Sequence, residues 1–325
     1  MIIGGRSKTL KTGIACDLVV SLGSGTPFLG RFDTRQVAVG FWSGESGAAT
    51  IRETAKRIAV ARGVDLADAW ALWCFDLPRL SDLTHLDALE ETIRLHGLRV
   101  AIIDPLYLAL LTPEMAGGAS NLFMMGALLQ GITRIGQRTN CTIVLLHHFR
   151  KGGQADDENP ADLEELAQSG VVEWARQWLL LQRRGKFQSD GKHSLWMRCG
   201  GSAGHFSVWG LVIDEGILDP DTGDGRRWEV TVTAQGNVRK EAEQERENRK
   251  AAEQEQLEGK HREELLAALR ENPEGETKKA LRDTTGLNEK YFKKAIACLI
   301  QEGRATRCKM MKNRRQEDAF KPTEK

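Results

Sequence analysis

The sequence lacks the features that mark an exported or membrane-embedded chain. No apolar run reaches about 18 residues, the length that a membrane-spanning helix needs, and the start shows no signal-peptide pattern. The six cysteines lie far apart without a C-x-x-C pair, so a disulfide framework is not expected. We therefore expect a cytoplasmic protein with reduced thiols and no membrane partner.

The chain also has almost no net charge. Its 46 Lys and Arg residues against 45 Asp and Glu residues give a formal charge of +1, which neither indicates nor excludes a nucleic-acid partner. The distribution is uneven, because residues 264–325 hold 15 basic and 10 acidic side chains. The apolar fraction of 41% is high enough to bury a core, which excludes general disorder.

Short apolar runs alternate with helical patterns over the first half of the chain, which is typical of α/β proteins. Strands are expected at residues 1–3, 36–43, 69–75, 98–104 and 141–148, and helices at 12–25, 48–63 and 121–140. Four further apolar runs, 177–184, 193–201, 206–216 and 226–236, follow with no helix between them. The pattern predicts a mainly parallel sheet completed by antiparallel strands at one edge.

The composition changes near residue 237. Residues 237–262 are rich in Ala, Glu, Gln, Lys and Arg without an apolar face, which predicts a charged helical linker. We therefore expect an α/β domain over residues 1–236, the linker over 237–262 and a second domain over 263–325. The last segment, with three helical patterns, a cap at Thr277 and two strands around a basic tip, fits a small winged helix of the α+β class.

The stretch "GGRSKTLKT" at residues 4–12 nearly matches the phosphate-binding pattern G-x-x-x-x-G-K-[ST]. Counted from Gly5, Leu10 stands at the second glycine; a left-handed backbone there would cost about 1–3 kcal/mol. The pair Lys8-Thr9 would need a glycine at Ile2, so the spacing favours Lys11 on the β- and γ-phosphates and Thr12 on Mg²⁺. An ordinary turn is the alternative. The expected nucleotide-binding residues are Gly4, Gly5, Arg6, Ser7, Lys8, Thr9, Leu10, Lys11 and Thr12.

Polar residues follow three of the expected strands. Asp104 ends the strand "VAIID", where it would bind Mg²⁺ directly or through water, since ligands of open α/β folds gather at this edge. Glu45 follows "FWSG" and could deprotonate an attacking water, or could be an ordinary acid at a helix start. His147 and His148 end another strand at the position of a γ-phosphate sensor, although alternation along the strand makes one of them a core histidine.

Five segments together resemble the RecA-like hexameric helicase family, and within it the plasmid replication helicase RepA group. They are "GGRSKTLKT", "SGES", "VAIIDP", "LLHHFRKG" and "LAQSGVVEWARQW", and the resemblance spans residues 1–236. It implies a RecA-like P-loop domain that binds ATP and Mg²⁺ in a homo-oligomer, with a hexamer as the family's form. On this resemblance Lys11 and Thr12 match the loop residues, Glu45 the catalytic base, Asp104 the second-motif Asp, and His147/His148 the sensor.

The resemblance also implies an arginine supplied by the next subunit and a DNA channel. Arg176, Arg183 and Arg184 are the candidate arginines, and the match does not choose among them. Lys151, in the polar segment 150–160, is expected to contact single-stranded DNA. One departure from the family pattern is Leu10, which bears on turnover more than on binding.

A winged helix would place its third helix in the DNA major groove and its wing on the backbone. Lys290, Lys293 and Lys294 lie on one face of that helix, and Arg314 and Arg315 stand at the wing tip. We expect duplex DNA as the partner, with a protein-docking role as the alternative.

Three functions remain open at this point. The first is a DNA-dependent ATPase, a replicative helicase-like motor of a plasmid or phage-like element. The second is a regulator in which ATP switches the winged helix without translocation. The third is a structural DNA-binding protein with a degenerate loop, which predicts no thermal stabilisation by Mg·ATP.

Overall fold

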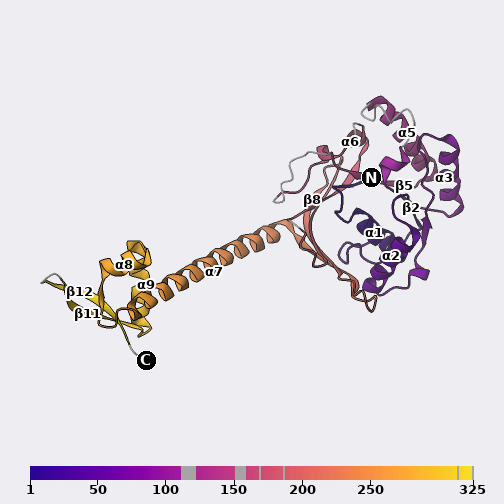
Figure 1. Ribbon diagram of the computed structural model, residues 1–325. Coiled ribbons are helices and arrows are strands. Elements are labelled where there is room, and N and C mark those ends of the chain that lie inside the picture. Colours follow the sequence, from indigo (N-terminus) through magenta and orange to yellow (C-terminus); the bar gives the residue numbers. More distant parts are fainter. Residues whose placement is uncertain (111–121, 151–158, 168–169, 186, 313–314, 324–325) are drawn as a thin grey trace. The chain divides into compact units, whose positions relative to one another are not determined.

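The computed structural model describes residues 1–110, 122–150, 159–167, 170–185, 187–312 and 315–323 (Figure 1). The chain folds as two compact units, Met1–Val238 and Arg239–Lys325. Each unit has its own hydrophobic core.

A sheet of nine strands forms the centre of the first unit, in the order β3-β2-β4-β5-β1-β6-β7-β8-β9. The strands from β3 to β6 in this order are parallel, and β6 to β9 are antiparallel. Their bounds are β1 Ile2–Gly5, β2 Val39–Ser43, β3 Ala71–Cys74, β4 Val100–Asp104, β5 Thr142–His148, β6 Gln177–Arg183, β7 Lys192–Gly201, β8 Phe206–Gly216 and β9 Arg226–Ala234. The expected mixed α/β class with a large, mostly parallel sheet is confirmed.

Helices cover both faces of the parallel part (Figure 1). One face packs against α1 (Lys11–Ser24) and α2 (Ala48–Arg62), and the other against α3 (Leu83–Leu95), α4 (Leu106–Ala109), α5 (Leu122–Thr139) and α6 (Val171–Trp174). Short 3₁₀ helices lie at Leu66–Asp68 and Leu163–Glu165. Because strand side chains alternate, Phe41 enters the core under α1 and α2 while its neighbour Trp42 enters the opposite one.

The helices predicted at residues 12–25, 48–63 and 121–140 begin and end within one residue of α1, α2 and α5. In α2 the buried residues Ile51, Ala55 and Ile58 follow helical spacing, and Gly63, at φ 66°, ends the helix in the left-handed conformation. Gly25 does the same for α1, at φ 77°. The sequence interpretation omitted α3, whose buried face is formed by Leu86, Leu89 and Ile93.

A buried polar cluster joins β9 to α1 and α2. Asp17 of α1 is fully buried, and its carboxylate accepts hydrogen bonds from Arg62 Nη2 at 2.5 Å and Trp228 Nε1 at 2.6 Å. Ser21 Oγ and the Leu29 backbone N–H donate to the same group. The antiparallel edge is thereby attached to α2 and to α1, the helix that follows the N-terminal loop.

Helix α7 (Gln235–Arg270) begins in the last residues of the first unit, and the rest of it belongs to the second unit. It leads into β10 (Glu276–Thr277), α8 (Lys278–Thr285), α9 (Glu289–Gln301), β11 (Ala305–Lys312) and β12 (Arg315–Pro322). The strands form an antiparallel sheet in the order β10-β12-β11. Thr277 caps α8, as expected, by accepting a hydrogen bond from the Ala280 N–H. Leu265, Phe292 and Leu299 are central to its core.

The expected linker and the first helix of the second domain differ from prediction in one respect. They form a single helix, α7, in place of two segments. Good helix formers fill this stretch, and its internal Gly259 does not break the helix. Among the residues that the structure describes, no helix combines the length and apolarity needed to cross a bilayer. All six cysteines are free.

Candidate functional site

The N-terminal loop connects β1 to α1, and glycine is required where the strand ends. A Cβ on Gly5 would lie 2.7 Å from Thr9 Oγ1 and 2.8 Å from the Leu181 carbonyl oxygen. A Cβ on Gly4 would lie 2.6 Å from the Leu166 side chain. The end of β1 is therefore packed against β6, Leu166 and the loop itself, with no room for side chains at these two positions.

Leu10, at the position of the pattern's second glycine, adopts the left-handed conformation, with φ 57° and ψ 26°. Lys8 is also left-handed, at φ 60°, and Thr9 Oγ1 donates to the Arg6 carbonyl at 2.8 Å. The expected strain at Leu10 is thus present, at about 1–2 kcal/mol for a non-glycine residue. In spite of this strain the loop leads directly into α1. The first N–H groups of a helix have no partner within the helix, so they can bind an anion in the loop.

Lys11 is the first residue of α1, and its side chain folds back over the loop. Its Nζ donates to the carbonyl oxygens of Gly5 at 3.0 Å and Arg6 at 2.7 Å. Burial lowers the pKa of Lys11 to about 8, although the nearby charges of Asp104 and Glu45 act to raise it. Within the described ranges, these two carbonyls are the hydrogen-bond partners of the buried ammonium, and such a cation inside a phosphate-type loop suits an incoming anion.

Thr12 and Asp104 meet across the sheet. Thr12 Oγ1 donates to Asp104 Oδ2 at 2.7 Å, and Asp104 is only 3% exposed. Burial raises the pKa of Asp104 to about 6, against the Thr12 hydrogen bond and the Lys11 charge, which lower it. A hydroxyl and a carboxylate are hard oxygen ligands of the kind that Mg²⁺ prefers, so this pair fits the expected metal. No cluster of three or more His, Cys, Asp or Glu residues suited to a metal occurs in the described ranges.

Glu45 lies in the loop between β2 and α2, beside the end of β4. The loop is fixed by the Gly44 N–H, which donates to the Asp104 carbonyl at 2.8 Å, and by Ser43 Oγ, which donates to the Ser46 carbonyl at 2.9 Å. Glu45 precedes the N-cap of α2, Gly47, and the first turn of α2 contains no acidic residue. Glu45 thus lies two residues before the helix cap, and its exposed carboxylate is close enough to Lys11 and Asp104 to affect their charges. Its role as a base and its role as an acid at a helix start both stay predictions.

The two histidines of β5 have different surroundings. His147 is 2% exposed, with Nε2 2.8 Å from the Ala167 carbonyl oxygen, so this nitrogen carries a proton; burial lowers the His147 pKa to about 4. His148 pairs in register with Gly5 on β1, and it is half-buried. Burial and the Lys11 charge lower the His148 pKa. His148 thus lies on the face with Lys11, and His147 is the core histidine of the pair.

Tyr107 belongs to this group and was missed at the sequence level. Its ring centroid is 5.3 Å from that of His148, and burial together with the Glu45 and Asp104 charges raises the Tyr107 pKa. It follows Asp104 by three residues, on the short α4. Its proximity to Asp104 along the chain was the only available signal.

The three candidate arginines have different surroundings within the chain. Arg183 Nη2 donates to the carbonyl of Lys8 at 2.6 Å, beside the loop of its own chain. Arg184 lies over the Trp196 ring at 5.2 Å. Arg176 precedes β6 at the opposite end of the sheet, where its carbonyl accepts from the Ser202 N–H. A role in a neighbouring subunit stays a prediction for each.

The DNA-contact predictions fall partly outside the described residues. Lys151 and Arg314 lie outside them, as does the side chain of Arg315. On α9, Lys290 is exposed, whereas Lys293 forms an ion pair with Glu289 at 3.1 Å and Lys294 one with Glu258 at 2.5 Å. The lysines share the helix, but two of them are already paired with carboxylates.

The comparison with known protein families agrees with this arrangement of residues. Residues 1–154 match the family model of the AAA domain. The match runs from β1 past the end of β5, and so includes Lys11, Glu45, Asp104 and His148. This region is therefore a P-loop ATPase-like domain, of a kind that includes RecA- and RepA-like helicase-type domains. No curated protein matches the chain.

Proposed function

We propose that the chain is a Mg²⁺-dependent ATPase of the RecA/RepA type that acts on DNA, as a helicase-like motor in replication of a plasmid or phage-like element. The observation that carries the ATPase part is the bond between Thr12 Oγ1 and Asp104 Oδ2 at 2.7 Å. It joins the two motifs that hold the metal in P-loop enzymes, with Lys11 on the adjacent turn. The AAA-domain match over residues 1–154 supports the same assignment.

Each residue then has a defined task. Lys11 would leave its two loop carbonyls and bind the phosphates, a move favoured because its ammonium is buried without a carboxylate contact. Bound Mg²⁺ would neutralise phosphate charge, with Thr12 and Asp104 as its nearest protein oxygens. Glu45 would accept a proton from water, and His148 would contact the terminal phosphate from β5.

DNA enters this proposal through the second unit. Its element order, helix, short strand, two helices and a two-stranded hairpin, fits a winged helix. On that assignment α9 is the recognition helix, with Lys290 exposed and Lys293 and Lys294 beside it. Arg314 and Arg315 would contact the backbone from the wing, and Lys151 would contact a single strand at the first unit.

One observation favours a second candidate, the nucleotide switch without turnover. Within the described residues, no hydrogen bond or ion pair orients the exposed Glu45 carboxylate. A base that only a neighbouring subunit could orient would leave a single chain able to bind ATP but slow to hydrolyse it. The switch and the motor then differ in whether assembly on DNA raises turnover.

Steady-state ATP hydrolysis with and without single-stranded DNA separates these functions. The motor predicts turnover that requires Mg²⁺ and rises several-fold with DNA. ATP binding with no turnover under either condition would favour the switch. If Mg·ATP neither binds nor raises the melting temperature, both fail, because a ligand at 100 times Kd adds about 2.7 kcal/mol of stability.

A further inference from the structure

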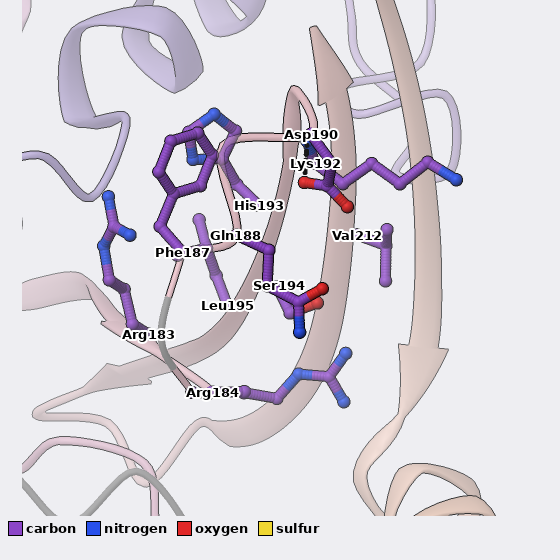
Figure 2. Close-up of a pocket in the computed structure, with 11 residues that line it drawn as sticks. Arg183, Arg184, Phe187, Gln188, Asp190, Lys192, His193, Ser194, Leu195 and Val212 are labelled. Atoms are coloured by element: carbon purple, nitrogen blue, oxygen red, sulfur yellow. Dashed lines mark hydrogen bonds between the residues drawn. The ribbon is translucent and has the colours of Figure 1, made fainter. Parts of the chain in front are cut away.

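A cavity of about 290 Å³ opens at the ends of β6 and β7 (Figure 2). In the sheet, these two strands lie on the opposite side of β1 from β2, β4 and β5, whose ends carry Glu45, Asp104 and His148. Its walls come from the strand ends and from described residues of the hairpin that joins them, among them Phe187, Gln188 and Asp190. Of the candidate site residues discussed above, Arg183 and Arg184 line it.

Arg183 connects this cavity to the N-terminal loop. Its Nη2 donates to the Lys8 carbonyl at 2.6 Å, and its guanidinium carbon lies 5.4 Å from the centre of the Phe187 ring. One side chain therefore contacts both the loop and the aromatic wall of the cavity. A molecule with its phosphates in the loop would have this wall next to it.

The order of strands fixes which end of a nucleotide faces the cavity. Glu45, Asp104 and His148 follow β2, β4 and β5, which all lie on one side of β1. The terminal phosphate and the attacking water belong on that side, where the base and metal ligands are. The nucleoside end then points to the other side of β1, toward β6 and β7, and β7 lies two strand spacings, or about 10 Å, from β1.

Neighbouring side chains hold the Phe187 ring, which forms the aromatic wall, in place. The rings of Phe187 and His193 are stacked, with centroids 4.7 Å apart and planes 13° from parallel (Figure 2). His193 Nε2 lies 3.1 Å from Glu215 Oε2, and Glu215 also pairs with Arg57 of α2 at 3.3 Å. Phe187 itself is 42% exposed. A large, exposed aromatic ring held by this chain of contacts is pre-organised for stacking.

We propose that the cavity binds the base and ribose of the nucleotide whose phosphates occupy the Gly5–Thr12 loop, with Phe187 as the stacking surface. The exposed part of the ring would stack on a purine, and the Arg183 guanidinium, which lies over the ring, would place a cationic group next to the base. Gln188 and Asp190 supply an amide and a carboxylate at the rim for the polar edge of the base or the ribose hydroxyls. This assignment rests on the proposed nucleotide site and names how that site holds the nucleoside.

The test compares binding of Mg·ATP with binding of Mg·tripolyphosphate, which has the same phosphate chain without a base, by calorimetry on the full chain. Phe187→Ala should weaken ATP binding about 10-fold or more and leave tripolyphosphate binding unchanged. Phe206→Ala removes another exposed phenylalanine, 62% exposed at the far end of β7 and β8, and should change neither. Phe187→Trp, which keeps a stacking surface, should bind ATP at least as well as the wild-type chain.

Each other outcome is decisive. Equal loss of ATP and tripolyphosphate in Phe187→Ala, with Phe187→Trp also weakened, would mean that the residue supports the loop and not the base. Unchanged ATP binding in Phe187→Ala would remove the cavity from the site while leaving the phosphate loop intact. If the wild-type chain binds neither ligand, the proposed nucleotide site itself fails, and this assignment fails with it.

Discussion

Thr12 and Asp104 are 92 positions apart in the sequence, yet Thr12 Oγ1 donates a 2.7 Å hydrogen bond to Asp104 Oδ2. The contact arises because β4 and β1 are parallel strands separated only by β5, so that the end of β4 and the start of α1 meet at one edge of the sheet. The Gly44 N–H donates to the Asp104 carbonyl and brings the Glu45 loop to the same edge. Three separate motifs are thus assembled around one buried carboxylate.

The charge of Asp104 should make stability depend on pH in a recognisable way. Its pKa of about 6 in the folded chain lies above the ordinary 3.8, so the folded state holds the proton longer and stability falls as pH rises between these values. Asp104→Asn removes this loss. Without nucleotide, the free energy of unfolding of the variant should match that of the wild-type chain near pH 4 and exceed it by up to about 3 kcal/mol at pH 7. The variant also loses the attraction between the Asp104 and Lys11 charges, which reduces this gain.

Denaturant unfolding followed by tryptophan fluorescence measures this difference on the full chain. All eight tryptophans lie within Met1–Val238, so the signal reports the unit that contains Asp104. A difference that stays constant between pH 4 and pH 7 would contradict the assigned role of burial.

Leu10 should tolerate glycine. In Leu10→Gly the left-handed strain of about 1–2 kcal/mol disappears, which offsets the greater freedom of glycine in the unfolded chain. We expect little change in melting temperature and unreduced ATP turnover. Leu29→Gly is the matched control, since Leu29 is also left-handed, at φ 54°, but only 1% exposed. That variant should lose about 2–5 kcal/mol of stability through its missing side chain. Equal losses of stability in the two variants would show that relief of backbone strain at Leu10 does not contribute to the stability of the loop.

Glu45→Gln should separate binding from hydrolysis. The amide keeps the size of the side chain but cannot accept a proton from water, so turnover should fall by about 10²–10⁴-fold while ATP affinity changes little. The exposed Glu53, on α2, supplies the control, and Glu53→Gln should keep its activity. A Glu45→Gln chain with full turnover would exclude Glu45 as the base.

Asp17 should matter for stability more than any surface acid. Asp17→Ala leaves Arg62 and Trp228 Nε1 buried without their carboxylate, and we expect a loss of about 3–5 kcal/mol in the free energy of unfolding. Glu90→Ala breaks the pairs that Glu90 forms with the exposed Arg94 and Arg138, and should cost less than about 2 kcal/mol. Similar losses from both changes would contradict the importance assigned to burial.

Duplex DNA binding, if α9 is a recognition helix, should depend on Lys290. Lys290→Ala should weaken binding across sequences and lower the salt dependence of log K by about one counterion. Glu258→Gln frees Lys294 from its carboxylate partner and should strengthen binding. Fluorescence anisotropy over a range of salt concentrations measures both. Unchanged affinity in both variants would favour the protein-docking role.

Sequence patterns predicted the fold of the first unit well, because its strands are apolar runs and its helices have clear ends. The loop, Asp104 and Glu45 were also predictable, since each follows a strand and carboxyl ends of parallel strands share an edge. The contribution of Tyr107 could not be predicted, because its position depends on the turn after Pro105. The cavity around Phe187 was hidden as well, since it requires the β6–β7 hairpin to lie beside the loop. Nor did the pattern distinguish His147 from His148, whose burial depends on the segment that reaches Ala167.

The most direct test of the central assignment is ATP hydrolysis by the purified chain, with and without single-stranded DNA, beside Lys11→Ala and Lys8→Ala. Lys11 is the buried cation of the loop, held by the Gly5 and Arg6 carbonyls, whereas the Lys8 side chain is exposed. We expect activity to be lost in Lys11→Ala and retained in Lys8→Ala. Equal activity in the wild-type chain and Lys11→Ala would show that this loop is not the site of ATP hydrolysis.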